Sequence, residues 1–205
     1  MMRVVLVTLC CLVTSQVSAQ TAFVQGGYSR DIKRFSHEGE TSVLDATAGG
    51  FSIGAGAFLA GRWSAGVEMD LGGPSSVVDT VSVVISGRPA EIRTEYTSRR
   101  RSVSALAGFH TSAARRLRVG CYAGLSFTAF RREIFSDAPA IVLQEPTVPT
   151  VVNERITGAI VGVDVAIHVT PNVAVVPALR AQGLSLSGDL SGFSVRPSLN
   201  GRVVF

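Results

Sequence analysis

Apolar and polar residues alternate along most of the chain beyond residue 20, and a period of two residues predicts β-strands. In 63–72, one face carries apolar side chains while the other carries Ser64, Glu68 and Asp70. The closing segment alternates in the same way. The pattern predicts eight strands, at roughly 22–31, 48–60, 63–72, 97–110, 116–132, 155–169, 172–184 and 192–205.

The predicted connections alternate between short and long. Short turns fall at 60–62, 111–115 and 170–172, and long loops at 32–47, 73–96 and 133–154. Short turns at one end and long loops at the other are typical of outer-membrane barrels. The strands are also long enough, because about 9 to 11 tilted residues cross the hydrocarbon. The pattern predicts an all-β fold, an eight-stranded antiparallel up-and-down transmembrane β-barrel.

The chemistry of the two faces separates a membrane barrel from a soluble one. Glycine, serine and charged residues of both signs share one face, which suits a narrow interior in which buried charges must be paired. The other face is apolar and is expected to meet lipid. The charged residues expected to point inward as one cluster are Glu68, Asp70, Arg118, Asp164, Arg180, Arg196 and Arg202.

Aromatic side chains on the outward face are expected to form two belts at the membrane interfaces. Trp63, Phe109 and Phe205 belong to the periplasmic end. The outer end is expected to hold Tyr28, Phe51 and Phe127.

The segment Val77–Ile85 also reads as a strand, although it lies in the long connection 73–96. A ninth spanning strand would leave the two termini on opposite sides of the membrane. We therefore expect an extracellular hairpin in which 77–85 pairs with about 90–97 around Gly87 and Pro89, residues that favour turns. Such a hairpin would offer exposed edges to an extracellular protein partner. The alternative is a loop without regular pairing.

The N-terminus reads as a secretory signal peptide over residues 1–19, followed by the barrel domain over 20–205. Arg3 supplies the positive charge, Val4–Val13 the apolar core and Val17–Ala19 the small residues of a cleavage site. Beyond the first 14 residues no apolar run approaches the roughly 18 to 20 residues of a spanning helix. The formal net charge is +4, but export separates the chain from nucleic acid, which we exclude as a partner.

With these features the chain resembles the small OmpA/OmpX-type eight-stranded β-barrel proteins of the Gram-negative outer membrane. The signal peptide, the alternating strands and the closing segment Asn200–Phe205 carry the resemblance. The terminal Phe205 looks like the assembly signal of that family. The resemblance implies location in the outer membrane and insertion by the outer-membrane assembly machinery, but no particular activity.

Catalytic and metal-binding combinations are poor. The three histidines, His37, His110 and His168, fall in separate segments. His110 and Ser112 faintly resemble the His/Ser pair of lipid A deacylases, but no carboxylate in the following strand would orient the histidine. We expect no enzyme activity, no metal and no cofactor.

Arginines gather where the fourth, fifth and sixth strands reach the outer rim. Parity directs Arg99, Arg101, Arg131 and Arg155 outward, whereas Arg100 and Arg132 turn inward. Lipopolysaccharide presents phosphates at that level, and arginine binds phosphate through paired, charge-assisted hydrogen bonds. The four are candidate lipopolysaccharide contacts. The alternative is that they are merely solvated rim residues.

The function that follows is that of a monomeric outer-membrane β-barrel with a structural or surface-interaction role. Its expected partners are outer-membrane lipids and lipopolysaccharide, together with an extracellular protein that binds 73–96. The alternatives are a narrow outer-membrane pore and a soluble periplasmic ligand-binding β-barrel.

Overall fold

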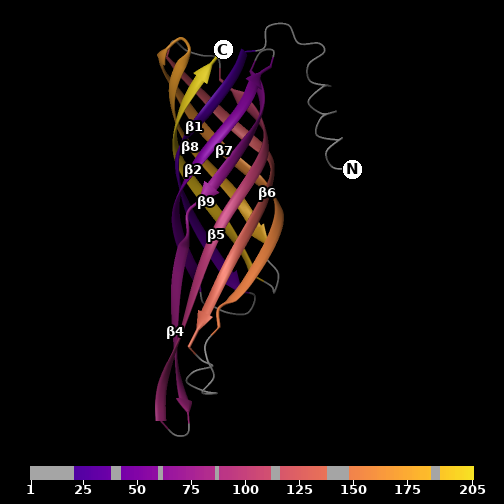
Figure 1. The fold of residues 1–205 in the computed structure, drawn as a ribbon. Helices are drawn as coiled ribbons and strands as arrows, with labels where there is room; N and C mark the ends of the chain where they lie inside the picture. Colours follow the sequence, from indigo (N-terminus) through magenta and orange to yellow (C-terminus); the bar gives the residue numbers. More distant parts are fainter. Residues whose placement is uncertain are drawn as a thin grey trace.

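The protein is a closed antiparallel β-barrel with one hairpin that extends beyond it (Figure 1). The structure is a computed structural model that describes residues 21–37, 43–59, 62–85, 88–111, 116–137, 148–185 and 190–205. In chain order the strands are β1 (Thr21–His37), β2 (Val43–Phe58), β3 (Trp63–Gly72), β4 (Ser75–Ile85), β5 (Arg88–His110), β6 (Leu117–Ser136), β7 (Thr150–Thr170), β8 (Val173–Ser185) and β9 (Leu190–Val204). The predicted signal peptide lies outside the described residues.

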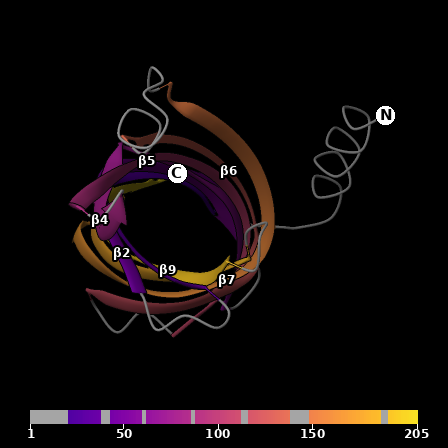
Figure 2. The same cartoon turned by 90° about the horizontal axis from the view of Figure 1, so that it is seen from below.

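Neighbouring strands pair in sequence order, except that β4 is bypassed. The ring closes through β1 with β9 on one side and through β3 with β5 on the other. Eight of the described strands therefore form the barrel, and the view along its axis shows the strands surrounding a common interior (Figure 2). The predicted fold class is confirmed.

Side-chain direction follows the two-residue period around the ring. Most large apolar side chains point outward, and Trp63 and Phe51 are 56% and 69% exposed, although a few, such as Leu106 and Phe130, are buried inside. Charged and hydroxyl side chains point inward and are buried, among them Glu68, Asp164 and Arg202. The polarity is thus inverted relative to a water-soluble barrel, whose large apolar residues fill the inside.

The predicted aromatic positions all lie on the outward face and are exposed. The Trp63 and Phe109 rings meet edge to face with centroids 5.2 Å apart, and Phe205 lies at the same end, where β9 finishes. Tyr28 and Phe51 form a second edge-to-face pair, at 6.2 Å.

Two of the three predicted long loops are wrong in extent. Much of 32–47 is strand, because β1 continues to His37 and β2 begins at Val43. β6 likewise continues to Ser136, and β7 begins at Thr150. The polar composition of these segments suggested loops. The antiparallel ladder nevertheless continues there, since each strand finds a partner that satisfies its backbone N–H and C=O groups.

The hairpin predicted within 73–97 is confirmed, and it leaves the barrel at the end opposite the C-terminus (Figure 1). β4 pairs with the first half of β5 from Ser75 opposite Ser98 to Ile85 opposite Arg88. β5 is 23 residues long. Its first half therefore pairs with β4 in the hairpin, and its second half pairs with β3 in the barrel. Among the residues that the structure describes, no helix has the length and hydropathy needed to cross a membrane.

Shortening the hairpin tests whether the barrel closes without it. Asp79 lies opposite Thr94, so replacing 80–93 by Asn-Gly would join them through a two-residue type I′ turn. We expect the variant to fold, because the ladder that closes the barrel pairs β3 with 101–109 of β5 and lies outside the deleted segment. The measurement is heat-modifiable migration of the purified protein. Loss of the fast-migrating band of the unheated, folded protein would contradict the view that the barrel needs only the second half of β5.

Fluorescence of Trp63, the only tryptophan of the chain, tests the direction of the outward face. In lipid vesicles we expect brominated acyl chains to quench it, most strongly with bromine near the interface, because interfacial aromatic rings sit at headgroup level. Quenching by aqueous iodide alone would overturn the assignment of this face to lipid.

Candidate functional site: charged interior and outward arginines

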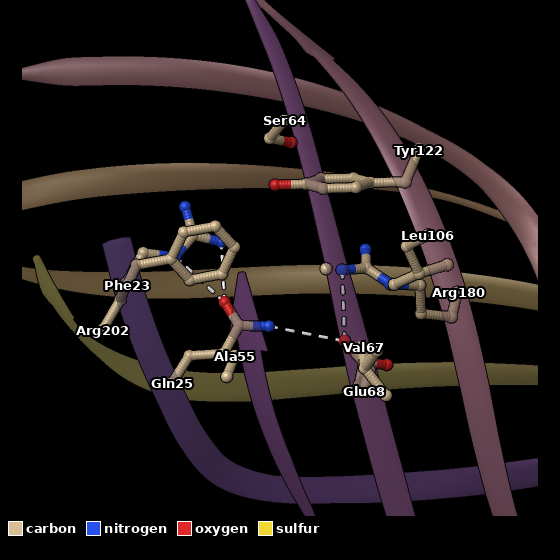
Figure 3. A pocket seen from close by; sticks show the side chains of 11 residues that line it. Phe23, Gln25, Ala55, Ser64, Val67, Glu68, Leu106, Tyr122, Arg180 and Arg202 are labelled. Atoms are coloured by element: carbon tan, nitrogen blue, oxygen red, sulfur yellow. Dashed lines mark hydrogen bonds and ion pairs between the residues drawn. The ribbon is translucent and has the colours of Figure 1, made fainter. Parts of the chain in front are cut away.

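The half of the interior nearer the C-terminus holds two ion pairs, one between opposite strands of the ring and one between β7 and β9, which are separated only by β8. Arg180 of β8 lies 3.4 Å from Glu68 of β3, and Arg202 of β9 lies 2.6 Å from Asp164 of β7. Gln25 links the two pairs, since its oxygen accepts from Arg202 at 2.7 Å and its amide nitrogen donates to Glu68 at 3.4 Å (Figure 3). The four charged side chains therefore form one hydrogen-bonded network.

Aromatic rings and glycines give this network its shape. Tyr122 donates to Asp164 at 2.8 Å, and its ring centroid lies 4.6 Å from the Arg180 guanidinium. A Cβ atom at Gly162 would lie 2.6 Å from the backbone oxygen of Leu179 and 2.5 Å from Cδ of Arg180, so a side chain there would force the strand or the guanidinium to shift. The space left beside Glu68 is about 20 Å³, roughly enough for one water.

The other half of the interior holds a second network, which includes an ion pair between Asp70 and Arg196, two members of the predicted cluster. Arg100 donates to Asp31 at 2.9 Å, and Lys33 lies 3.6 Å from the same carboxylate. Gln182 accepts from Arg100 at 3.2 Å and donates to Thr128 at 2.9 Å. Two cations therefore share the carboxylate of Asp31.

Arg118 is the predicted cluster member that the structure does not bring to a carboxylate. Among the described residues no ion pair involves it, and its guanidinium lies 4.6 Å from the ring centroid of Phe58. The other six predicted members meet in three pairs: Glu68 with Arg180, Asp70 with Arg196, and Asp164 with Arg202.

Asp31 and Lys33 were not among the predicted interior residues. Asp31 is the last residue of the predicted first strand, 22–31, and Lys33 lies beyond that predicted end. Both are buried, and Lys33 is 0% exposed. Extending the alternation beyond Tyr28, across Ser29, Asp31 and Lys33, would have found them. Because residues 29–33 are mostly polar, the sequence did not indicate that the strand continues there.

A serine–histidine contact lies near the end of the barrel that holds Trp63 and Phe109, although it is not the pair considered from the sequence. Ser112 lies outside the described residues. His110 instead has its Nε2 2.7 Å from the hydroxyl of Ser64. Nδ1 of His110 and Oδ1 of Asp164 have no hydrogen-bond partner among the described residues, so the three side chains do not form a connected catalytic triad.

The four outward arginines are all exposed and lie in two neighbouring rows across β5, β6 and β7. Arg99 is directly opposite Arg131, while Arg101 and Arg155 lie on either side of Ala129. Arg131 makes an exposed ion pair with Glu133 at 3.0 Å. As parity requires, Arg100 is buried and Arg132 is half-buried.

The terminal residue Phe205 lies on the outside and is exposed. Its backbone N–H donates to the carbonyl of Ala22 at 2.8 Å, and the N–H of Val204 donates to the carbonyl of Asn172 at 2.9 Å. The C-terminus is therefore tied to the first strand and to the turn before β8.

Comparison by sequence finds no relative, because no family model and no curated protein matches the chain. Solved structures do match. Neisserial surface protein A superimposes with a TM-score of 0.59 at 16% identity, covering 92% of this chain and 100% of that one. OprG from Pseudomonas aeruginosa gives 0.53 at 11% identity, with 92% and 97% covered. A major outer membrane protein from Thermus thermophilus gives 0.52 at 12% identity, with 92% and 100% covered.

Identities this low show the fold alone. That fold is the small outer-membrane β-barrel of the OmpA/OmpX type that the sequence predicted.

Proposed function

We propose that the protein spans the outer membrane as a sealed, non-enzymatic barrel and acts through its cell-surface end. The inversion of its two faces carries the proposal. Large apolar side chains such as Phe51 and Leu199 point outward and are exposed, whereas charges fill the inside. Exposed apolar area on this scale is unfavourable in water and favourable in lipid. In this proposal residues 1–19 direct export and Phe205 is read by the outer-membrane assembly machinery.

The two alternatives, a narrow pore and a soluble ligand-binding barrel, are less well supported. A pore needs a continuous water-filled path, but cross-barrel ion pairs such as Arg180 with Glu68 span the interior at several levels. A soluble binding barrel needs an apolar interior cavity. In this interior, charged residues and small apolar clusters fill the space, and the gap beside Glu68 admits roughly one water.

A catalytic role has little support from the one Ser–His contact. Ser64 and His110 are both buried, and Asp164 directs Oδ2 to Tyr122 and Arg202 rather than to the histidine. A serine nucleophile needs an oriented base and room for a substrate. The contact is better explained as a satisfied pair of buried polar groups.

The cell-surface end offers the protein-binding part of the proposed role. β4 pairs with β5 along one edge, and its exposed residues include Val78, Val81 and Val84. An exposed strand edge with β-branched side chains can accept an extended segment of a partner. The segment 73–96 is therefore the proposed contact for an extracellular protein.

The arginine rows offer the lipid-binding part. Arg99, Arg101, Arg131 and Arg155 lie beyond the outward residue Phe127, which belongs to the predicted outer aromatic belt. Phosphates of lipopolysaccharide lie at this level in the outer leaflet. We assign the four guanidiniums to contacts with those phosphates.

Electrical recording tests the sealed interior. In planar bilayers the folded protein is expected to produce no stable conductance steps under conditions in which a porin control does, because paired side chains fill an eight-stranded interior. Heat-modifiable migration of the same sample verifies folding. Reproducible steps from the folded monomer would support the pore instead.

Removing one member of an interior pair tests the inward network. Glu68→Ala leaves Arg180 without its carboxylate, and we expect the free energy of unfolding to fall by about 3 to 5 kcal/mol. Urea titration of the folded barrel in vesicles measures this.

The matched control is Glu133→Ala, because Glu133 pairs with Arg131 on the exposed face. An exposed pair contributes about 0 to 1 kcal/mol. Equal, small losses in both variants would contradict a buried, stabilising interior network.

A further inference from the structure

The outward face of β3, β5, β6 and β7 contains a groove of about 360 Å³ beside the arginine rows. Its outward-pointing lining residues include Met69, Arg101, Val103, Phe127, Ala129 and Arg155. It combines two cations with an apolar floor on the outward face of the sheet.

Strand register explains why the groove forms there. Ala129 lies directly opposite Arg101 on β5 and Arg155 on β7. Because a methyl group stands between two long side chains, the surface is hollow at that point. The next row toward the periplasmic end places Val103 opposite Phe127, which supplies the apolar floor.

Positive charge gathers at the outer end of this groove. Among the described residues no ion pair involves Arg101 or Arg155, and the next row places Arg99 opposite Arg131. Like charges directly opposite each other destabilise a sheet. Glu133 offsets Arg131, so an added anion would be most favourable between the other arginines.

The groove also lies at the right height for a lipid headgroup. Arg101 is eight residues beyond Phe109, the aromatic residue at the periplasmic end of the same strand. About 9 to 11 tilted residues cross the hydrocarbon, which places Arg101 close to the outer interface. The floor residues Val103 and Phe127 would then lie at acyl-chain depth.

We infer that this groove binds one phosphorylated, acylated glycolipid of the outer leaflet, the lipid A part of lipopolysaccharide. Its phosphate lies between Arg101 and Arg155, and one acyl chain lies along Val103 and Phe127. This inference rests on the proposed outer-membrane function. It makes the four arginines unequal, since Arg101 and Arg155 hold the phosphate while Arg99 and Arg131 add only general attraction.

Filling the groove without changing charge provides the sharpest test. Ala129→Phe places a ring between the two guanidiniums, and Arg101→Gln with Arg155→Gln removes the cations. We expect each of these two variants to weaken the binding of lipid A to the delipidated, refolded barrel by roughly tenfold or more. The added ring occupies the place of the phosphate, and the double Gln variant loses the charge-assisted hydrogen bonds to it. Native mass spectrometry measures the binding.

The controls keep size and charge matched. Ala123→Phe adds the same ring to an outward position farther along β6, where Ala123 lies opposite Ala107 and Val161, and should leave binding nearly unchanged. Arg99→Gln with Arg131→Gln removes equal charge and should weaken binding only a few-fold, as expected for exposed, screened charges. Dephosphorylated lipid A and inorganic phosphate alone should each bind the native protein much more weakly than intact lipid A.

Unchanged lipid A binding by folded Ala129→Phe overturns the groove, as does equal binding of the dephosphorylated lipid. Heat-modifiable migration and cell fractionation of the same variants report the proposed function separately. A folded variant in the outer membrane that keeps its lipid refutes only the groove, whereas wild-type protein absent from that membrane refutes the proposed function.

Discussion

The structure depends on one ladder of backbone hydrogen bonds, that between β3 and β5. It runs from Trp63 opposite Phe109 to Leu71 opposite Arg101. Without it the sheet would have two open edges, and unpaired backbone groups are not tolerated in lipid. Closure requires β4 to leave the ring. Past the end of β3, the N–H of Gly73 donates to the carbonyl of Gly49 at 2.7 Å, which anchors the chain where the hairpin departs.

Closure around eight strands then determines the chemistry of the interior. The space is narrow enough for side chains to fill, and a charge placed there needs a partner. Several partners come from strands far apart in sequence, as with Arg180 of β8 and Glu68 of β3. A register slip of one residue would expose these charges to lipid and bury apolar groups. We expect the networks to contribute to specificity of register as well as to stability.

Alternation alone was sufficient to predict the ring of strands and the inward direction of residues such as Glu68 and Arg180. It could not predict which charges meet, because partners across the barrel depend on strand tilt and stagger rather than on parity. Strand ends were predicted less well. Asp31 and Lys33 belong to β1, which continues beyond the residues whose outward side chains are apolar. In that part of the strand the composition does not distinguish a paired strand from a loop. Ser64 and His110 were missed because the contact depends on the register between β3 and β5, which neither residue reveals by itself.

Lys33 has a consequence for chemical labelling. It is the only lysine of the chain, and its amine is sealed inside the barrel beside Asp31, 5.7 Å from the Phe130 ring centroid. The outer surface therefore presents guanidiniums but no lysine amine. Amine-directed acylating reagents should spare this side chain while the barrel is closed and modify it once the barrel opens. The protein thus carries its own single-site reporter of barrel opening.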